Sequence, residues 1–372
     1  PGRAPLTLPS PRCAGRGNER RNRCLSFAPR SGEKVPEGRM RGAFADRMSN
    51  DKSHFPSRTD LAFTRESPYG TQAEPTYSGA LSFLRRQYTK DLAGVDVAVF
   101  GIPFDTATTN RPGTRFGPRA IRQASASLAW CRPYSWDFDP LDRLHVIDFG
   151  DLHFDHGRPE RVPDAIRDQV AAIVSAGVLP LALGGDHFVS YPILQALAAK
   201  HGPLSLIHFD AHSDTWEDAD GRIDHGTMFF HAAKQGLVDP ARSIQLGLRT
   251  FNPESHGYDV RDANWMHAHG LAATLAAIRE RVGAQPCYVS FDIDFLDPAY
   301  APGTGTPVVG GFSTHDALHL IRGLAGLNVI GADVVEVSPP YDVSDITALA
   351  AASIAHELLA VIASRYPDRP AR

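Results

Sequence analysis

Short apolar runs alternate with helix-forming segments from about residue 95 towards the end of the chain. Seven of these runs are almost continuously apolar, and they cover residues 95–101, 144–148, 179–183, 204–209, 243–248, 287–292 and 329–335. Strands that are covered on both faces of a parallel sheet show this pattern, whereas strands with one solvent-facing side alternate apolar and polar residues. The runs therefore predict a buried, mostly parallel β-sheet.

The segments between the runs predict helices, because they begin at proline or capping residues. Pro118, Pro163 and Pro192 stand at three expected starts, and Ser313 or Thr314 stands at a fourth. These helices are expected over residues 119–128, 165–176, 192–201 and 316–324. Strands and helices in alternation predict an α/β fold, here a three-layer α/β/α sandwich with a doubly wound, mostly parallel sheet.

The composition of the 372-residue chain narrows the classes of function without choosing one. The formal net charge of -4 gives no overall basis for binding nucleic acid, and the four cysteines form no CxxC pair. This cysteine pattern suits a reducing compartment, so we expect a cytoplasmic protein. The most apolar stretch, residues 346–363, is interrupted by His356 and Glu357, so we expect no membrane span.

The N-terminal stretch differs from the rest of the chain. Residues 1–47 carry many arginines and no periodic apolar face, and they lack the apolar core of a secretory signal. We expect residues 1–60 to be an extension that is disordered, or not native before Met48, and residues 61–372 to form one catalytic domain. An arginine-rich transit peptide is the alternative.

Side chains that bind metal ions follow three of the predicted strands, at the edge where open α/β sheets bind ligands. They are His187, then Asp210, His212 and Asp214, then Asp292 and Asp294. Two histidines and four carboxylates exceed the needs of a tetrahedral zinc site. They suit two hard divalent ions that share carboxylate bridges, so we predict a two-metal hydrolase.

An extended backbone would explain why each cluster converges, because residues at i, i+2 and i+4 point to one side of a strand. The explanation requires the strands to continue through residues 210–214 and 292–294. Alone, each motif is more typical of a turn or a helix cap, but their joint occurrence at strand ends favours a metal site. The sequence leaves the roles of two loops undecided. Gly184 and Gly185 form either a tight turn or a close passage beside the metals. Residues 304–307 form either a plain loop or a wall of the site.

His225 and Glu336 are two further candidates. His225 lies in a loop downstream of residues 210–214, where a solvated histidine and a catalytic histidine are both reasonable. Glu336 ends the buried run 329–335, where a carboxylate is costly unless it is paired. Its partner is therefore a cation, either an arginine of the protein or a cationic substrate.

Taken together, these motifs resemble the ureohydrolase family of arginases and agmatinases. The resemblance runs from about Val95 to Ala363 and rests on segments that follow the family's order: GGDHFVS (184–190), HFDAHSDT (208–215), DHGTMF (224–229), SFDIDFLDPAYAPGTGTPVVGG (290–311) and DVVEVSPPYD (333–342). Segments 136–151, 224–229 and 335–342 are most similar to bacterial agmatinases. The residues before about 60 match nothing in the family.

The resemblance implies a role for each candidate residue. One Mn²⁺ would be held by His187, Asp210, Asp214 and Asp292. The other would be held by Asp210, His212, Asp292 and Asp294, so that Asp210 and Asp292 bridge the two ions. Nickel or cobalt would suit similar ligands. His225 matches the family's proton-shuttle histidine, Asp294 would steer the proton of the nucleophile, and Glu336 matches the carboxylate that receives the guanidinium. The resemblance also implies an arginase-like fold and a homo-oligomer, either a trimer or a hexamer.

The implied reaction converts agmatine, a small cationic guanidino substrate, to putrescine and urea. A guanidinobutyrase or another guanidino-acid hydrolase would share the chemistry with a different tail. The loop 215–224 favours agmatine, because its four carboxylates against one arginine would repel an anionic tail. Arg111 and Arg115 would act in the opposite direction if they reached the pocket. A single-zinc deacetylase and a catalytically silent homologue are further alternatives, and the complete ligand set argues against both.

Overall fold

The computed structural model describes residues 75–218 and 220–368, and one parallel eight-stranded sheet runs through them. The strand order is β2-β1-β3-β8-β7-β4-β5-β6. The strands are β1 (Val97–Gly101), β2 (Val146–Asp151), β3 (Leu179–Leu183), β4 (Ser205–Phe209), β5 (Ile244–Leu246), β6 (Asp259–Arg261), β7 (Cys287–Asp292) and β8 (Val329–Val335). All the expected strands are present. The short edge strand β6 was not expected, because Asp-Val-Arg is not an apolar run.

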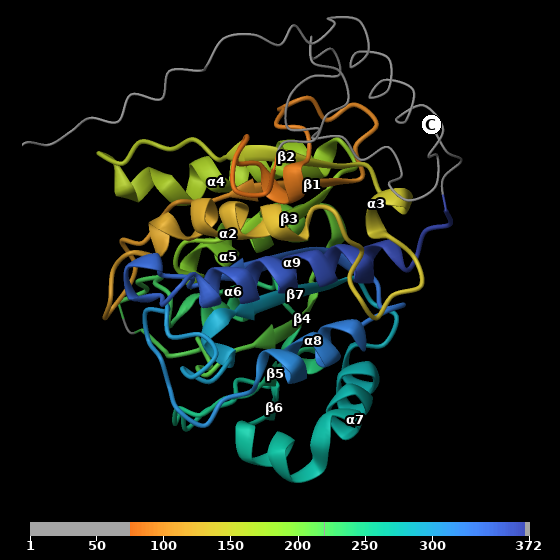
Figure 1. The fold of residues 1–372 in the computed structure, drawn as a ribbon. Helices are drawn as coiled ribbons and strands as arrows, with labels where there is room; N and C mark the ends of the chain where they lie inside the picture. Colours follow the sequence, from red (N-terminus) through yellow and green to blue (C-terminus); the bar gives the residue numbers. More distant parts are fainter. Residues whose placement is uncertain (1–74, 219, 369–372) are drawn as a thin grey trace, which may run out of the picture. The chain divides into compact units, whose positions relative to one another are not determined.

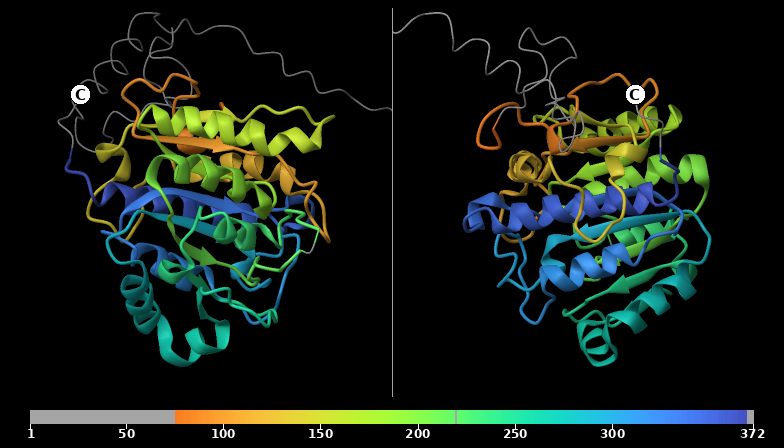
Figure 2. Two further views of the ribbon diagram at one scale, coloured as in Figure 1. Left: turned by 180° about the vertical axis from the view of Figure 1, so that it is seen from behind. Right: turned by 45° about the vertical axis from the view of Figure 1, so that its right-hand side comes forward.

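Helices cover both faces of this sheet. They are α2 (Gly117–Ser125), α3 (Pro140–Arg143), α4 (Val162–Ser175), α5 (Ser190–His201), α6 (Met228–Lys234), α7 (Ala263–Val282), α8 (Thr314–Arg322) and α9 (Ile346–Ala363). Helices α2, α9 and α8 lie side by side on one face, in front in Figure 1, and α4, α5 and α6 cover the other face, which Figure 2 shows from behind. The three-layer α/β/α sandwich is therefore confirmed.

The alternation of side chains along the strands builds a separate core on each face of the sheet. In β1, Val97 and Val99 belong to the core that includes α8 and α9, whereas Ala98 and Phe100 belong to the core that includes α4 and α5. Both sets of side chains are fully buried. Two buried faces explain why the strands read as continuous apolar runs.

Helix α9 is the one described helix that is long and apolar enough to cross a membrane, and it serves as a core helix instead. Of its 18 residues, 83% are buried inside the protein, where it packs against α2, α8 and β8.

The proline and capping residues in the sequence predicted the positions of the neighbouring helices correctly. Ser313 caps α8, since its Oγ accepts from the backbone N–H of Asp316 while the Asp316 carboxylate accepts from the backbone N–H of Ser313.

Two short 3₁₀ helices stand directly after central strands and shape the edge of the sheet. They are η5 (His187–Val189), which follows β3, and η7 (Ile293–Phe295), which follows β7. The expected N-terminal extension and its boundary near residue 60 lie outside the described residues, so that division of the chain stays a prediction.

Candidate metal centre and active site

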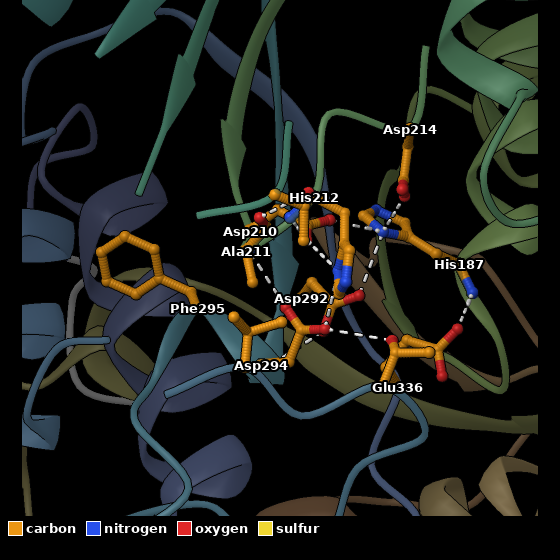
Figure 3. A network of polar contacts seen from close by, with 12 residues as sticks. His187, Asp210, Ala211, His212, Asp214, Asp292, Asp294, Phe295 and Glu336 are labelled. Atoms are coloured by element: carbon orange, nitrogen blue, oxygen red, sulfur yellow. Dashed lines mark hydrogen bonds and ion pairs between the residues drawn. The ribbon is translucent and has the colours of Figure 1, made fainter. Parts of the chain in front are cut away.

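Four neighbouring strands in the middle of the sheet, β3, β8, β7 and β4, end at the same edge. The structure brings all the sequence-predicted site residues together there, and Figure 3 shows the labelled ones facing one another. They are His187 after β3, Asp210, His212 and Asp214 after β4, Asp292 and Asp294 at and after the end of β7, and Glu336 after β8, with His225 approaching from the loop before α6.

One group of ligand atoms converges on the imidazole of His187. Its Nδ1 atom lies 3.1 Å from Asp210 Oδ2, 2.9 Å from Asp214 Oδ2 and 3.2 Å from Asp292 Oδ2. Each of the four residues has at most 5% of its surface exposed. Three carboxylate oxygens and one imidazole nitrogen therefore surround a single buried point.

A second group converges on His212. Its Nδ1 atom lies 3.3 Å from Asp210 Oδ1 and 3.1 Å from Asp294 Oδ2. Asp210 contributes one oxygen to each group, which is the arrangement of a carboxylate that bridges two cations. The His212 side chain is 23% exposed, so this group lies on the solvent side of the cluster.

The strand explanation for this convergence is wrong. Asp214 has a left-handed φ of 51°, and Asp294 lies in η7 rather than in extended backbone. Turns bring the carboxylates together instead. The backbone N–H of Asp294 donates to Asp292 Oδ1 at 2.8 Å, and that of His212 donates to Asp210 Oδ1 at 2.6 Å. Aspartate forms such turns with the backbone two residues further on.

The hydrogen bonds behind His187 determine which of its nitrogens carries the proton. Ser290 Oγ donates to Asp333 Oδ1 at 2.8 Å, so it accepts from His187 Nε2, which lies 2.7 Å away. The hydroxyls of Tyr288 and Ser190 donate to Asp333 Oδ2. His187 Nδ1 faces three carboxylates. Burial would lower the pKa of this imidazole, but the three carboxylates raise it well above its usual value, so the position calls for positive charge. The residues present therefore fit a divalent metal ion.

His208 is a contributor that the sequence analysis missed. Its Nδ1 accepts from Gln245 Nε2 at 3.1 Å, so its Nε2 carries the proton and donates to Asp210 Oδ2 at 2.7 Å. This hydrogen bond orients Asp210 rather than adding a ligand. The signal was present in the sequence, because His208 precedes Asp210 by two residues and shares its side of β4.

The electrostatics of the cluster also call for added positive charge. Burial raises the pKa of Asp292 well above its usual value, and the neighbouring charges of Asp294 and Asp210 raise it further. Burial would lower the pKa of His212, but Asp294 and Asp210 outweigh it and raise this pKa to about 12. Both shifts have one origin, which is a concentration of carboxylates without enough cations.

Glu336 lies beside the cluster with 1% of its surface exposed. Its Oε1 accepts from the backbone N–H of His187 at 2.8 Å and lies 3.2 Å from His225 Nδ1. Its Oε2 has no hydrogen-bond partner among the described residues. Within residues 75–218 and 220–368, no lysine or arginine forms an ion pair with it. The protein itself thus supplies His225 as a partner and leaves one oxygen for a cationic ligand.

The loop of residues 304–307 is a wall of the site and not a plain loop. A Cβ atom on Gly305 would lie 3.1 Å from Glu336 Oε2, so the absence of a side chain keeps space open in front of that oxygen. Thr306 Oγ1 donates to Asp294 Oδ2 at 3.3 Å. The loop therefore touches both the metal cluster and the free oxygen of Glu336.

The two glycines before His187 allow a close passage of the chain against neighbouring protein segments. A Cβ on Gly185 would overlap the carbonyl oxygen of Phe104, and one on Gly184 would overlap the side chain of Val335. The chain needs glycine there because it runs against the loop after β1 and against β8.

Known proteins resemble this chain in sequence and in fold. A profile of the arginase family matches residues 95–361. The chain belongs to the arginase family. An agmatinase from Chromobacterium violaceum is 51% identical over 82% of this chain and 96% of its own length. An agmatinase from Proteus mirabilis is 47% identical over 77% of this chain and 95% of its own length.

Solved structures of the arginase family agree with this fold. A hypothetical agmatinase from Burkholderia thailandensis superposes with a TM-score of 0.80 at 54% identity, covering 82% of this chain and 98% of that one. The proclavaminate amidino hydrolase from Streptomyces clavuligerus superposes with a TM-score of 0.73 at 38% identity, covering 79% of this chain and all of that one. Arginase-family enzymes depend on two metal ions, and the buried His/Asp cluster is where this ureohydrolase can hold them.

Proposed function

We propose that this ureohydrolase hydrolyses agmatine to putrescine and urea in the cytoplasm, with two Mn²⁺ ions and as a homo-oligomer. The observation that carries the proposal is the free, buried Oε2 of Glu336 beside the two groups of ligands. A buried carboxylate oxygen without a protein cation suits a guanidinium, which presents parallel N–H donors to it. The relatives named agmatinase support the same substrate.

The ligand groups would divide between two ions. His187, Asp214 and one oxygen each of Asp210 and Asp292 would hold the first ion, and His212, Asp294 and the other oxygen of Asp210 would hold the second. The resemblance to the family adds Asp292 to the second ion as a further bridge. Carboxylate and imidazole ligands suit Mn²⁺, and they also suit Co²⁺ or Ni²⁺. When bound, such a pair of ions lowers the pKa of water enough to supply a strong nucleophile near neutral pH.

Protein residues supply binding, orientation and proton transfer. Glu336 would hold the guanidinium so that its carbon faces the cluster. Burial would lower the pKa of His225, but the hydrogen bond and charge of Glu336 raise it to about 9, so the ring holds a proton at neutral pH. That proton is available to the amine that leaves when the C–N bond breaks. Asp294, fixed by Thr306 and the backbone N–H of Ala211, would steer the proton of the nucleophile.

Charges near the site favour a cationic tail over an anionic one. In the loop 215–224, Asp218 and Asp224 both pair with Arg222, at 3.2 and 3.3 Å, so this single arginine faces an excess of carboxylates. The two arginines that could have favoured an anionic tail each have a partner within the protein. Arg115 pairs with the buried Asp105, and the guanidinium of Arg111 stacks 4.9 Å above the ring of Tyr341.

Family membership alone does not determine which group the guanidino substrate carries at its other end. A relative that is 38% identical is named as a proclavaminate amidino hydrolase. A guanidino-acid hydrolase is therefore the second candidate. The test is a urea-release screen over agmatine, arginine, guanidinobutyrate and guanidine with protein loaded with Mn²⁺. We expect kcat/KM for agmatine to exceed the others by at least roughly tenfold, which is about 1.4 kcal/mol of discrimination.

Salt provides an internal control in this screen. The preference arises from charges on an exposed loop. Raising the ionic strength should therefore reduce the difference in kcat/KM between agmatine and the anionic substrates. Faster hydrolysis of guanidinobutyrate would replace agmatine with the second candidate. No urea from any of these compounds would overturn the ureohydrolase assignment as a whole.

A further inference from the structure

One residue outside the expected site contacts the shuttle candidate His225 directly. The backbone N–H of Thr109 donates to His225 Nε2 at 3.0 Å, and Thr109 Oγ1 lies 2.8 Å from the same nitrogen. His225 is only 9% exposed, whereas Thr109 is exposed to solvent. Thr109 therefore stands between a buried imidazole and the outside.

We propose that the Thr109 hydroxyl passes protons between His225 and solvent. Thr109 would be a positioning and relay residue for the proton shuttle, and this role rests on the proposed function. The two ring nitrogens have separate tasks in this arrangement. Nδ1 keeps its proton for Glu336 Oε1 at 3.2 Å, so Nε2 is the nitrogen that gains and loses a proton.

Thr109 offers a partner to each protonation state of Nε2. When the ring is neutral, Nε2 has a lone pair that accepts from the Thr109 backbone N–H. When the ring is protonated, that backbone N–H cannot serve as a partner, but Oγ1 can accept the Nε2 proton at the same distance. A hydroxyl suits this position because it can both donate and accept a hydrogen bond. An apolar side chain of the same shape can do neither.

Thr109 also lies at a cavity. It lines a cavity of about 430 Å³ together with Phe104, Phe188, Ile223 and Asp224, among others. Two hydrogen bonds attach the Thr109 loop to distant segments: the backbone N–H of Ala107 donates to Asp186, and Asn110 donates to the carbonyl of Gly305. The loop is thus anchored on both sides of Thr109.

The proton balance of the relay is simple. The Nε2–H bond breaks as a new Oγ1–H bond forms, and the former hydroxyl proton passes to water. Solvent then carries a proton to the amine as the C–N bond breaks, and the ring is left neutral with its proton on Nδ1. The proton released when the nucleophile forms restores the charged ring by the reverse path. The charges that act on the ring are those of Glu336, Asp214 and Asp186, and none of them belongs to the Thr109 loop.

The test compares Thr109→Val with Thr109→Ser in the full chain loaded with Mn²⁺. Valine keeps the shape and the backbone N–H but removes the oxygen. We expect Thr109→Val to lower kcat for agmatine by roughly tenfold with little change in KM, since general acid–base catalysis contributes about 10²- to 10⁴-fold in total. The alkaline limb of its pH–rate profile should move to lower pH, because the protonated ring of His225 loses the hydroxyl that accepts from Nε2. Thr109→Ser should restore both values.

The matched control is Thr108→Val, which removes a hydroxyl from the same loop and the same cavity without touching His225. It should leave kcat and the pH limb near wild type. Added morpholine, as a small proton donor, should raise the rate of Thr109→Val and not that of wild type. If Thr109→Val matches wild type, or if Thr109→Ser is as slow as Thr109→Val, the relay is wrong. Wild type that releases no urea from agmatine would instead overturn the proposed function.

Discussion

Replacing Glu336 by glutamine separates charge from shape at the substrate carboxylate. Glutamine retains an oxygen that can accept from the backbone N–H of His187, which Glu336 Oε1 does at 2.8 Å. It removes the negative charge that would face the guanidinium. The side chain is 1% exposed and its Oε2 has no protein partner among the described residues, so neither solvent nor a neighbouring anion compensates for the lost negative charge at that oxygen.

The expected loss can be estimated from this burial. Removing one partner of a buried ion pair costs about 3–5 kcal/mol. At about 1.4 kcal/mol for each factor of ten, kcat/KM for agmatine should fall by a factor of roughly 100 to 4,000. The stability of the variant should change little, because two effects oppose each other. Glutamine ends the burial of a charged carboxylate, but it also removes the anion that keeps the buried His225 protonated.

Three measurements check this prediction on Glu336→Gln. Steady-state urea release gives kcat/KM, elemental analysis gives the metal content, and thermal unfolding gives the stability. We expect kcat/KM to fall while the metal content and the stability stay near their wild-type values. A loss below tenfold would refute the assignment of Glu336 as the guanidinium carboxylate, and a loss of bound metal would mean that the residue supports the metal centre instead.

Three further outcomes follow from the same geometry. Asp292→Ala should abolish urea release and lower the bound metal measured by elemental analysis, because Asp292 Oδ2 lies 3.2 Å from His187 Nδ1 in the ligand cluster; near-native activity with two metals bound would contradict the assignment. Gly305→Ala should raise KM for agmatine by roughly tenfold, since its Cβ would lie 3.1 Å from Glu336 Oε2 and crowd the guanidinium; an unchanged KM would show that the substrate avoids this loop. The kcat of wild type should decline above about pH 9, where His225 loses its proton. This alkaline limb of the pH–rate profile should move to lower pH in Glu336→Gln, because the carboxylate of Glu336 raises the pKa of His225. A limb that stays at the same pH would show that another group titrates there.

The fold could be predicted from the sequence wherever a single hydrophobic pattern was clear. Runs such as Val329–Val335 are apolar because both faces of the sheet are covered, and the structure places this strand as expected. The edge strand β6 and the kinked helix α7, which bends at Gly270, carry no comparable pattern. In α7 the apolar residues do not form a single stripe, so tertiary contacts rather than periodicity decide its path.

The candidate metal ligands could also be picked out from the sequence, because acidic residues and histidines at strand ends are unusual together. Their supports were not. Ser290 and Asp333 lie on neighbouring strands β7 and β8, and Thr109 lies 116 residues before His225 in the chain. A sequence pattern contains no information about such pairs until the strand order is known, since the order β3-β8-β7-β4 brings distant segments together.

The same limit explains why the strand geometry proposed for the ligands was wrong. Asp214 and Glu336 both adopt left-handed backbone, with φ of 51° and 63°. Residues other than glycine rarely adopt this conformation, which costs of order 1 kcal/mol or more and persists only where the surroundings hold it. Here they do: the carbonyl of Asp214 accepts from the backbone N–H of Phe229 at 3.0 Å, and the backbone N–H of Glu336 donates to the carbonyl of Gly185 at 2.9 Å. The turn at each strand end directs the carboxylate back over the edge of the sheet, so the convergence of the site depends on contacts between loops and not on the alternation within a strand.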